Sequence, residues 1–148
     1  MTLRSAVGYA GDVEASAAYQ ELASDANAQL IDVRTRAEWS FVGIPDLSAI
    51  GKEPLLIEWQ SWPQMQVTAD FLDKLKAALK ERGVGTDVPL YFLCRSGVRS
   101  AAAAACAATI GFERSFNIAG GFEGPPDPGR HRGRVAGWKA SDLPWVQS

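Results

Sequence analysis

The sequence predicts an α/β fold in one domain, residues 1–148, with a mostly parallel sheet of about five strands and helices on both faces. Short apolar runs alternate with helical patterns along the chain, which is the order that a parallel sheet requires. Residues 88–93 (VPLYFL) are apolar at nearly every position, as in a strand buried on both faces. A length of 148 residues is enough for one domain with a sizeable hydrophobic core.

Two strands and a helix are expected in the first part of the chain. Residues 9–13 predict a short first strand. Residues 15–23 predict a helix with one buried face, because apolar residues recur there at helical spacing (Ala15, Ala18, Tyr19 and Leu22). Residues 29–34 then predict the second strand.

Polar residues gather where this second strand ends. Asp32 and Arg34 lie two apart, so they share one face of the strand. Asp32 either orients an arginine or amide groups of the loop that follows residues 88–93, or it caps a turn or forms a structural ion pair; we favour the structural role. Thr35 is a candidate cap for a short helix, and Arg34 and Glu38, four residues apart, are expected to pair there.

The middle of the chain holds an aromatic segment followed by the clearest helical pattern. We expect a strand within residues 54–59. Trp59 and Trp62 either wall a substrate pocket or cover the edge of the core, and we favour the core. Residues 68–82 carry an apolar stripe on one side and charges on the other, which predicts an amphipathic helix capped by Thr68.

The apolar run at residues 88–93 ends in Cys94, after which a short loop leads to an alanine-rich helix. We expect this helix to begin at Ser100, a good capping residue, and to run to about residue 110. Cys94 therefore lies where the carboxyl end of a strand meets the amino end of a helix. Ligands of parallel sheets bind at this edge, so Cys94 is the candidate nucleophile.

The residues after this cysteine favour an ionised sulfur. The first N–H groups of the helix have no partner within the helix, and they add partial positive charge to the loop. Arg95 and Arg99 add two full positive charges, and Gly97 allows the tight turn. We take Cys94 as the catalytic residue and the next six as binding residues for an anionic substrate (Arg95, Ser96, Gly97, Val98, Arg99 and Ser100).

The last third of the chain holds one more strand and a long loop. Residues 115–119 predict the strand, and residues 122–134 predict an inserted loop at the carboxyl edge of the sheet. The arginines of this loop either lay positive charge over the pocket or are simply solvated, and we favour solvation. The chain's one histidine, His131, is in this loop, and nothing in the sequence fixes it near the nucleophile. Cys106, within the alanine-rich helix, is expected to be a small core residue.

Composition excludes several classes of partner. A net charge of −2 argues against nucleic acid or a membrane surface as a partner, and no apolar stretch is long enough to span a membrane. No cluster of ligands has the spacing of a metal site, so we expect neither a metal nor a cofactor. Two cysteines and no apparent secretory signal favour a cytoplasmic protein.

The segment Cys-Arg-Ser-Gly-Val-Arg-Ser at residues 94–100 closely resembles the active-site loop of rhodanese-type sulfurtransferases. Other matching pieces follow the family's order along the chain: Leu30-Ile31-Asp32-Val33-Arg34, Glu38, Ile44-Pro45, Asn117-Ile118-Ala119-Gly120-Gly121, Trp138 and Leu143-Pro144. Two features depart from the family's pattern. Gly43 stands where many members carry histidine, and the segment from Gly121 to Trp138 is far longer than in compact members.

The resemblance implies a rhodanese-like fold and sulfur transfer in two steps. Cys94 takes a sulfane sulfur from a small anionic donor, thiosulfate or a persulfide, and holds it as a persulfide. A thiol, cyanide or a protein acceptor then removes that sulfur. Asp32 and Arg34 would act behind the loop, by positioning it.

Two other functions remain open at this stage. Rhodanese-like domains can act as non-catalytic binding or regulatory modules, although the presence of Cys94 argues against one here. The fold also supports phosphatases and arsenate reductases, whose loops resemble His-Cys, five residues and arginine. Here Leu93 precedes the cysteine, and only four residues separate Cys94 from Arg99. The donor, the acceptor and the oligomeric state stay undetermined.

Overall fold

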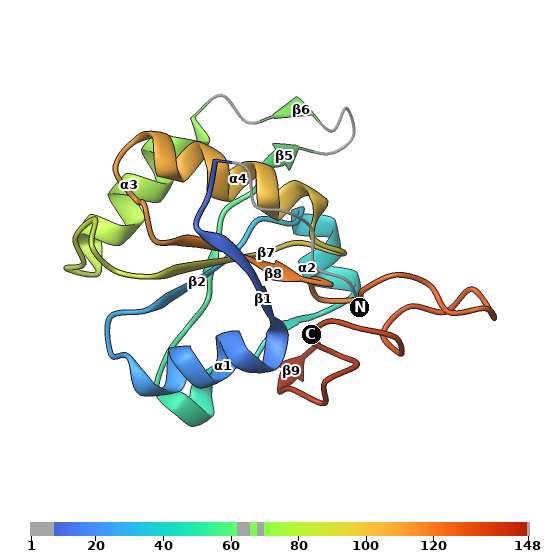
Figure 1. Cartoon of the computed structure of the whole chain (residues 1–148). Coiled ribbons are helices and arrows are strands. Elements are labelled where there is room, and N and C mark those ends of the chain that lie inside the picture. The colour runs from blue at the N-terminus through green and yellow to red at the C-terminus, as the bar shows by residue number, and fades with distance from the viewer. Residues whose placement is uncertain (1–7, 62–65, 68–69, 148) are drawn as a thin grey trace.

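The computed structural model describes residues 8–61, 66–67 and 70–147, and a five-stranded sheet forms its centre (Figure 1). The strand order is β1-β8-β7-β2-β4, and each of the four pairings is parallel. The strands are β1 (Gly11–Glu14), β8 (Ser115–Ala119), β7 (Leu90–Leu93), β2 (Gln29–Asp32) and β4 (Leu55–Leu56). The predicted sheet is confirmed, although the strand expected within residues 54–59 has only two residues and lies at the edge.

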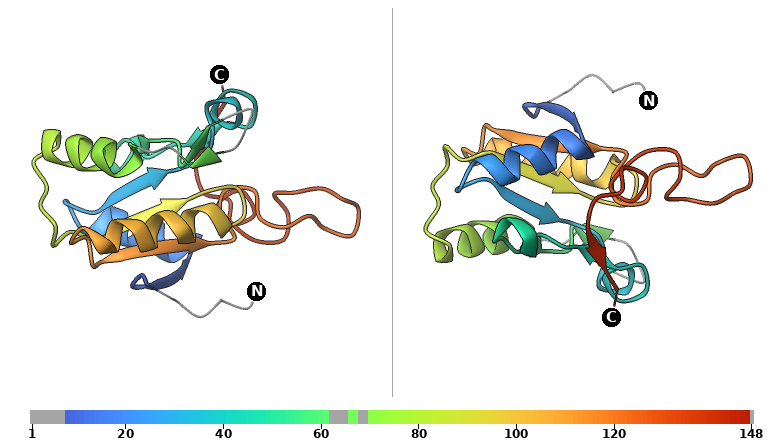
Figure 2. Two further views of the ribbon diagram at one scale, coloured as in Figure 1. Left: turned by 90° about the horizontal axis from the view of Figure 1, so that it is seen from above. Right: turned by 90° about the horizontal axis from the view of Figure 1, so that it is seen from below.

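Helices cover both faces of this sheet, as predicted. Figure 1 shows α3 and α4 above the sheet and α1 below it, and the two views of Figure 2 present these faces in turn. The helices are α1 (Ala15–Ser24), α2 (Arg36–Phe41), α3 (Phe71–Glu81) and α4 (Val98–Thr109), with a short 3-10 helix η1 (Ser48–Ile50). The predicted cap of α3, Thr68, lies outside the described residues.

Strand geometry divides the core into two layers. Successive side chains of a strand point to opposite faces, so Ile31 and Phe92 pack under α3 and α4, while Leu30 and Tyr91 face α1. The small side chains of α4 let that helix lie close to the sheet, with Ala103 fully buried. Cys106 is partly buried against the same layer, and both cysteines are free.

The alanine-rich helix begins two residues earlier than expected. Gly97, with φ of 109°, is the residue before its first turn, and α4 starts at Val98. Such a φ favours glycine, which has no Cβ to clash with the backbone. Ser100 therefore lies inside the helix, where its hydroxyl is free to act in the site instead of capping the helix.

The carboxyl-terminal segment binds back onto the face that α1 covers. Trp138 is fully buried, donates its indole N–H to the carbonyl oxygen of Pro144 at 2.7 Å, and meets Tyr19 edge-on. A two-residue strand β9 (Trp145–Val146) then pairs antiparallel with β3 (Ile44–Pro45). The family pieces at Ile44-Pro45, Trp138 and Pro144 thus form one continuous contact.

The aromatic segment after β4 contributes to the core. Trp59 is 8 % exposed and meets Phe71 of α3 edge-on at 5.0 Å between ring centres, so it covers the core edge as expected. Trp62 lies outside the described residues. A small antiparallel pair, β5 (Gln60–Ser61) and β6 (Gln66–Val67), follows.

Candidate active site

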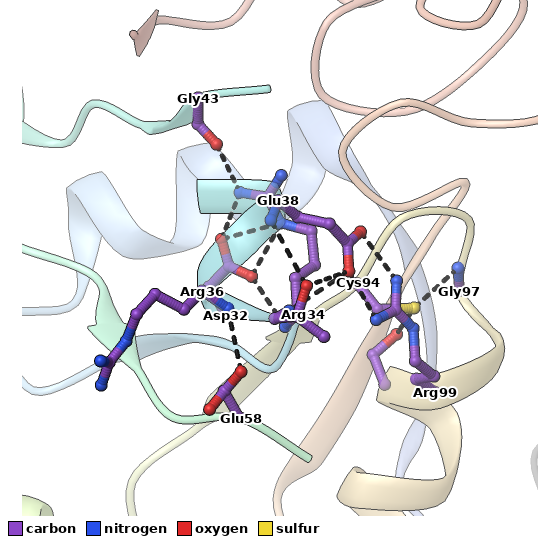
Figure 3. A network of polar contacts seen from close by, with 11 residues as sticks. Asp32, Arg34, Arg36, Glu38, Gly43, Glu58, Cys94, Gly97 and Arg99 are labelled. Carbon is purple, nitrogen blue, oxygen red and sulfur yellow. Dashed lines mark hydrogen bonds and ion pairs between the residues drawn. The ribbon is translucent and has the colours of Figure 1, made fainter. Parts of the chain in front are cut away.

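The candidate nucleophile stands at the end of the central strand. β7 ends at Leu93, and the positive φ of Gly97 turns the chain sharply into α4. The sulfur of Cys94 accepts a hydrogen bond from the N–H of Gly97 at 3.1 Å, and the Ser100 hydroxyl lies 3.1 Å away as a second donor (Figure 3). The residue is 1 % exposed, so these two donors meet the sulfur in a nearly dry environment.

A chain of polar side chains continues behind this sulfur. The Ser100 hydroxyl also donates to Asn117 Oδ1 at 2.5 Å, and Asn117 Nδ2 donates to Asp12 Oδ1 at 2.9 Å. The amide of Asn117 is therefore held with its oxygen toward the serine. Because a hydroxyl has one proton, Ser100 donates to either Asn117 or the sulfur at a given moment. It can turn its proton to the sulfur when negative charge develops there.

A second segment closes the other side of the cysteine loop. The N–H of Phe122 donates to the carbonyl oxygen of Cys94 at 2.8 Å, and the N–H groups of Glu123 and Gly124 both donate to that of Arg95 at 3.0 Å. Gly121 has φ of 62°, and a Cβ there would lie 2.6 Å from the Arg95 carbonyl carbon. Glycine is thus needed at position 121 for the close approach of these two segments.

Asp32 and Arg34 form a buried ion pair close to the loop. Both side chains are 0 % exposed; Arg34 Nη2 lies 2.7 Å from Asp32 Oδ2 and also donates to the Gly43 carbonyl oxygen at 2.7 Å. The guanidinium stacks over the Phe122 ring at 4.2 Å. This geometry matches the structural role that we favoured for Asp32.

The expected pairing of Arg34 with Glu38 is wrong. Glu38 instead binds Arg99 through two parallel hydrogen bonds of 2.7 and 2.9 Å, and it completes a capping box with Thr35 at the start of α2. Arg34 precedes the helix and points into the core, so the spacing rule for helix neighbours does not apply to it. The cap at Thr35 is confirmed.

The Glu38–Arg99 ion pair shifts the pKa of both residues. Burial by itself raises the pKa of Glu38, but the hydrogen bond and charge of Arg99, with bonds from Thr35, lower that pKa below its ordinary value. Burial acts to lower the pKa of Arg99, and the hydrogen bond and charge of Glu38 outweigh it, so the pKa of Arg99 is raised. The pair is therefore ionised at neutral pH.

A pocket of about 560 Å³ opens beside the cysteine loop. Its lining combines α2, the cysteine loop and the long loop after β8: Thr35, Ala37, Glu38, Val42, Gln60, Arg95, Arg99, Glu123 and Arg132. Arg95, one of these lining residues, is exposed, whereas Cys94 is not among them.

Two of the predicted binding residues are partly or largely open to solvent, and the chain's one histidine is exposed in its own loop. Val98 is 63 % exposed on the first turn of α4, and Ser96 is half-buried. His131 is 62 % exposed and lies 3.8 Å from Asp127 within its own loop. Within the described ranges, no three His, Cys, Asp or Glu side chains come close enough together to hold a metal ion.

The sequence reasoning missed three contributors to the site. The family pattern includes Asn117 without giving it a partner, no sequence signal marks Asp12, and the composition of its loop predicts a solvated Arg132, which instead lines the pocket. Asp12 and Asn117 lie opposite each other in the β1–β8 pairing. That register could have been anticipated only once the neighbouring strands were known.

Comparison with known proteins assigns the chain to a family. The model of the STR4 middle domain matches residues 10–148. The chain belongs to this family. A crystal structure of Rv0390 from M. tuberculosis is 41 % identical with a TM-score of 0.82, covering 95 % of this chain and 99 % of that one.

Further similarities, to the two proteins below, identify the chain as rhodanese-like. Rhodanese-like domain-containing protein 4 of Arabidopsis thaliana chloroplasts is 31 % identical over 93 % of this chain, which spans 26 % of that protein. The polysulfide-sulfur transferase homodimer of Wolinella succinogenes shares the fold, with 21 % identity and a TM-score of 0.55, over 93 % of this chain and 78 % of that one. Among the described residues, no helix is long and apolar enough to cross a membrane.

Proposed function

We propose that the protein is a sulfurtransferase that moves a sulfane sulfur from a small anionic donor to a thiophilic acceptor through a Cys94 persulfide. The observation that carries this proposal is the sulfur of Cys94, held between the N–H of Gly97 and the hydroxyl of Ser100 at the carboxyl edge of the sheet. Both groups can donate a hydrogen bond to negative charge that develops on the sulfur during transfer. The acceptor is a thiol in the cell, small or on a protein, and cyanide in an assay.

The reaction needs no group beyond those of the chain and its two substrates. The Cys94 thiolate attacks the outer sulfur of thiosulfate; the donor's S–S bond breaks, sulfite leaves with the electron pair, and a new S–S bond forms on Cys94. The charge of the persulfide's terminal sulfur is stabilised by N–H groups of the loop from Arg95 to Ser100. An acceptor thiolate then attacks that sulfur and restores the Cys94 thiolate.

Replacing the nucleophile tests this proposal directly. We expect Cys94→Ser to abolish sulfur transfer and the mass gain of about one sulfur atom after incubation with thiosulfate. Cys106→Ser is the matched control and should keep both, because Cys106 lies in the helix against the core. Unchanged transfer by Cys94→Ser, measured by product formation and intact mass, contradicts the proposal.

A non-catalytic binding module is the second candidate, favoured by the 1 % exposure of Cys94. Alkylation separates the two functions. A sulfur held as a thiolate reacts with iodoacetamide near pH 6 much faster than Cys106, whereas a covered, inert thiol reacts no faster. Phosphatase or arsenate reductase chemistry has less support, because Arg99, which would bind the oxyanion, is already engaged by Glu38.

A further inference from the structure

The long loop after β8 brings one arginine into the pocket. Arg132 lines the pocket with Arg95 and Arg99, although it comes from the segment that makes this chain longer than compact relatives. Its Nη1 donates to the carbonyl oxygen of Gly124 at 2.6 Å, and the residue is half-buried. A guanidinium has five N–H donors. One of them anchors Arg132, and others remain available to a ligand.

The charges around the pocket are not equally available. Arg99 is bound by both oxygens of Glu38, which neutralises it. Glu123 also lines the pocket, so its carboxylate offsets part of the positive charge there. Among the described residues, Arg95 and Arg132 form no ion pair with a carboxylate, so they are the two lining arginines whose charge can meet an anion.

We propose that Arg132 is a specificity-determining residue which, together with Arg95, binds the anionic group of the sulfur donor. This inference rests on the proposed function and names the part of the site that selects the donor. The group recognised is a compact oxyanion, either the sulfonate end of thiosulfate or the carboxylate of a small organic persulfide. Both match the planar guanidinium, which binds two oxygens at once.

In this arrangement Arg132 takes no part in bond making. Cys94 forms the new S–S bond as the donor's S–S bond breaks, and the electron pair leaves with sulfite or with the donor thiolate. Arg132 holds the oxyanion of the departing group together with Arg95, which lines the same pocket. Its contribution is made to donor binding, so it should appear in the KM for the donor and not in the second half-reaction.

The kinetic test compares Arg132→Ala with Arg134→Ala. Arg134 lies in the same loop and is 67 % exposed, and it does not line the pocket, so it controls for the loss of charge. With thiosulfate and cyanide, we expect Arg132→Ala to raise the KM for thiosulfate about tenfold, as for loss of one charge-assisted hydrogen bond. The kcat and the KM for cyanide should stay within about twofold, and Arg134→Ala should match the wild type. Equal effects of both variants overturn the proposal.

A comparison of three sulfur donors identifies which anionic group Arg132 binds. A carboxylate-bearing alkyl persulfide and its methyl ester are compared with thiosulfate on the wild type and Arg132→Ala. A KM rise for thiosulfate assigns the sulfonate, and a rise for the acid but not for its ester assigns the carboxylate. No rise with either thiosulfate or the acid overturns the proposal.

A readout without turnover separates this inference from the proposed function. Sulfite should protect Cys94 of the wild type from iodoacetamide, and Arg132→Ala should need about tenfold more sulfite for the same protection. Protection that depends on Arg132 in a protein without transfer activity upholds the anion site and rejects the sulfurtransferase. If the protein transfers sulfur but sulfite protects Cys94 equally well in Arg132→Ala, the sulfurtransferase is upheld and the anion site at Arg132 is rejected.

Discussion

Two arginine–carboxylate pairs lie side by side behind the cysteine loop, and they differ in burial. Figure 3 shows Asp32–Arg34 next to Glu38–Arg99. The side chains of the first pair are 0 % exposed, while those of the second are 16 % and 19 % exposed and line the pocket. The same chemistry thus serves two purposes: the sealed pair fixes the backbone, and the open pair sets the charge that a ligand meets.

Breaking the sealed pair is expected to have the largest effect. Asp32→Ala leaves the Arg34 guanidinium buried without a countercharge, which should lower the free energy of unfolding by about 3–5 kcal/mol. Urea denaturation measures this loss. The double variant Asp32→Leu, Arg34→Met removes both charges and should recover most of it. A loss below about 1 kcal/mol for Asp32→Ala would remove the contrast between the pairs.

Glu38→Gln should have a smaller effect on stability but a visible one on the pocket. The charge is lost while a polar group remains, so we expect the free energy of unfolding to fall by about 1–2 kcal/mol at pH 7. The lining gains one positive charge, so the KM for thiosulfate should fall about two- to fivefold at low salt and return toward the wild-type value as salt is added. A KM that does not respond to this charge would show that Arg99 does not face the donor.

The difference in unfolding free energy between wild type and Glu38→Gln should become smaller as the pH falls. The pKa of Glu38 is lower in the folded protein than its ordinary value of about 4.3. Its contribution to stability is therefore complete above the ordinary value and is lost as the pH falls through the folded value. Wild type and Glu38→Gln should converge in unfolding free energy as the pH falls through the folded pKa of Glu38. A difference in unfolding free energy that grows as the pH falls would contradict the stabilising ion pair of Glu38 with Arg99.

The smallest expected effect concerns the cap that positions Glu38. Thr35→Ala removes the hydroxyl that accepts the N–H of Glu38 and donates to its carboxylate, and should cost about 1 kcal/mol. Thr35→Ser keeps the hydroxyl and serves as the control. Thermal unfolding of the three proteins measures the difference; a serine variant as unstable as the alanine one would assign the loss to packing of the threonine methyl.

The sheet and the cysteine loop could be predicted because their signals are local. The apolar run of β7 and the loop that follows are contiguous in the sequence, and Thr35 lies next to the helix that it caps. The start of α4 was misplaced because a glycine with positive φ served as the cap in place of Ser100. Spacing alone could not tell that the serine was needed by the sulfur.

The partners within the site could not be predicted because they join distant parts of the chain. Glu38 and Arg99 are 61 residues apart, and Asp12 and Asn117 are 105 apart. Such contacts depend on strand order and on the orientation of the loops. A helix-spacing rule paired Glu38 with Arg34, whereas the fold turns Arg34 into the core and brings Arg99 to Glu38.

The hydrogen bonds from residues 122–124 to the carbonyl oxygens of Cys94 and Arg95 determine when, during folding, the loop around Cys94 becomes fixed. During synthesis, the strand and helix that flank Cys94 emerge well before the segment that clamps the loop. Until that segment has folded into place, the carbonyl oxygens of Cys94 and Arg95 lack these partners. The loop around Cys94 is therefore held from both sides only in the complete fold, and a copy of the chain that ends before residue 122 lacks the hydrogen bonds of the second side.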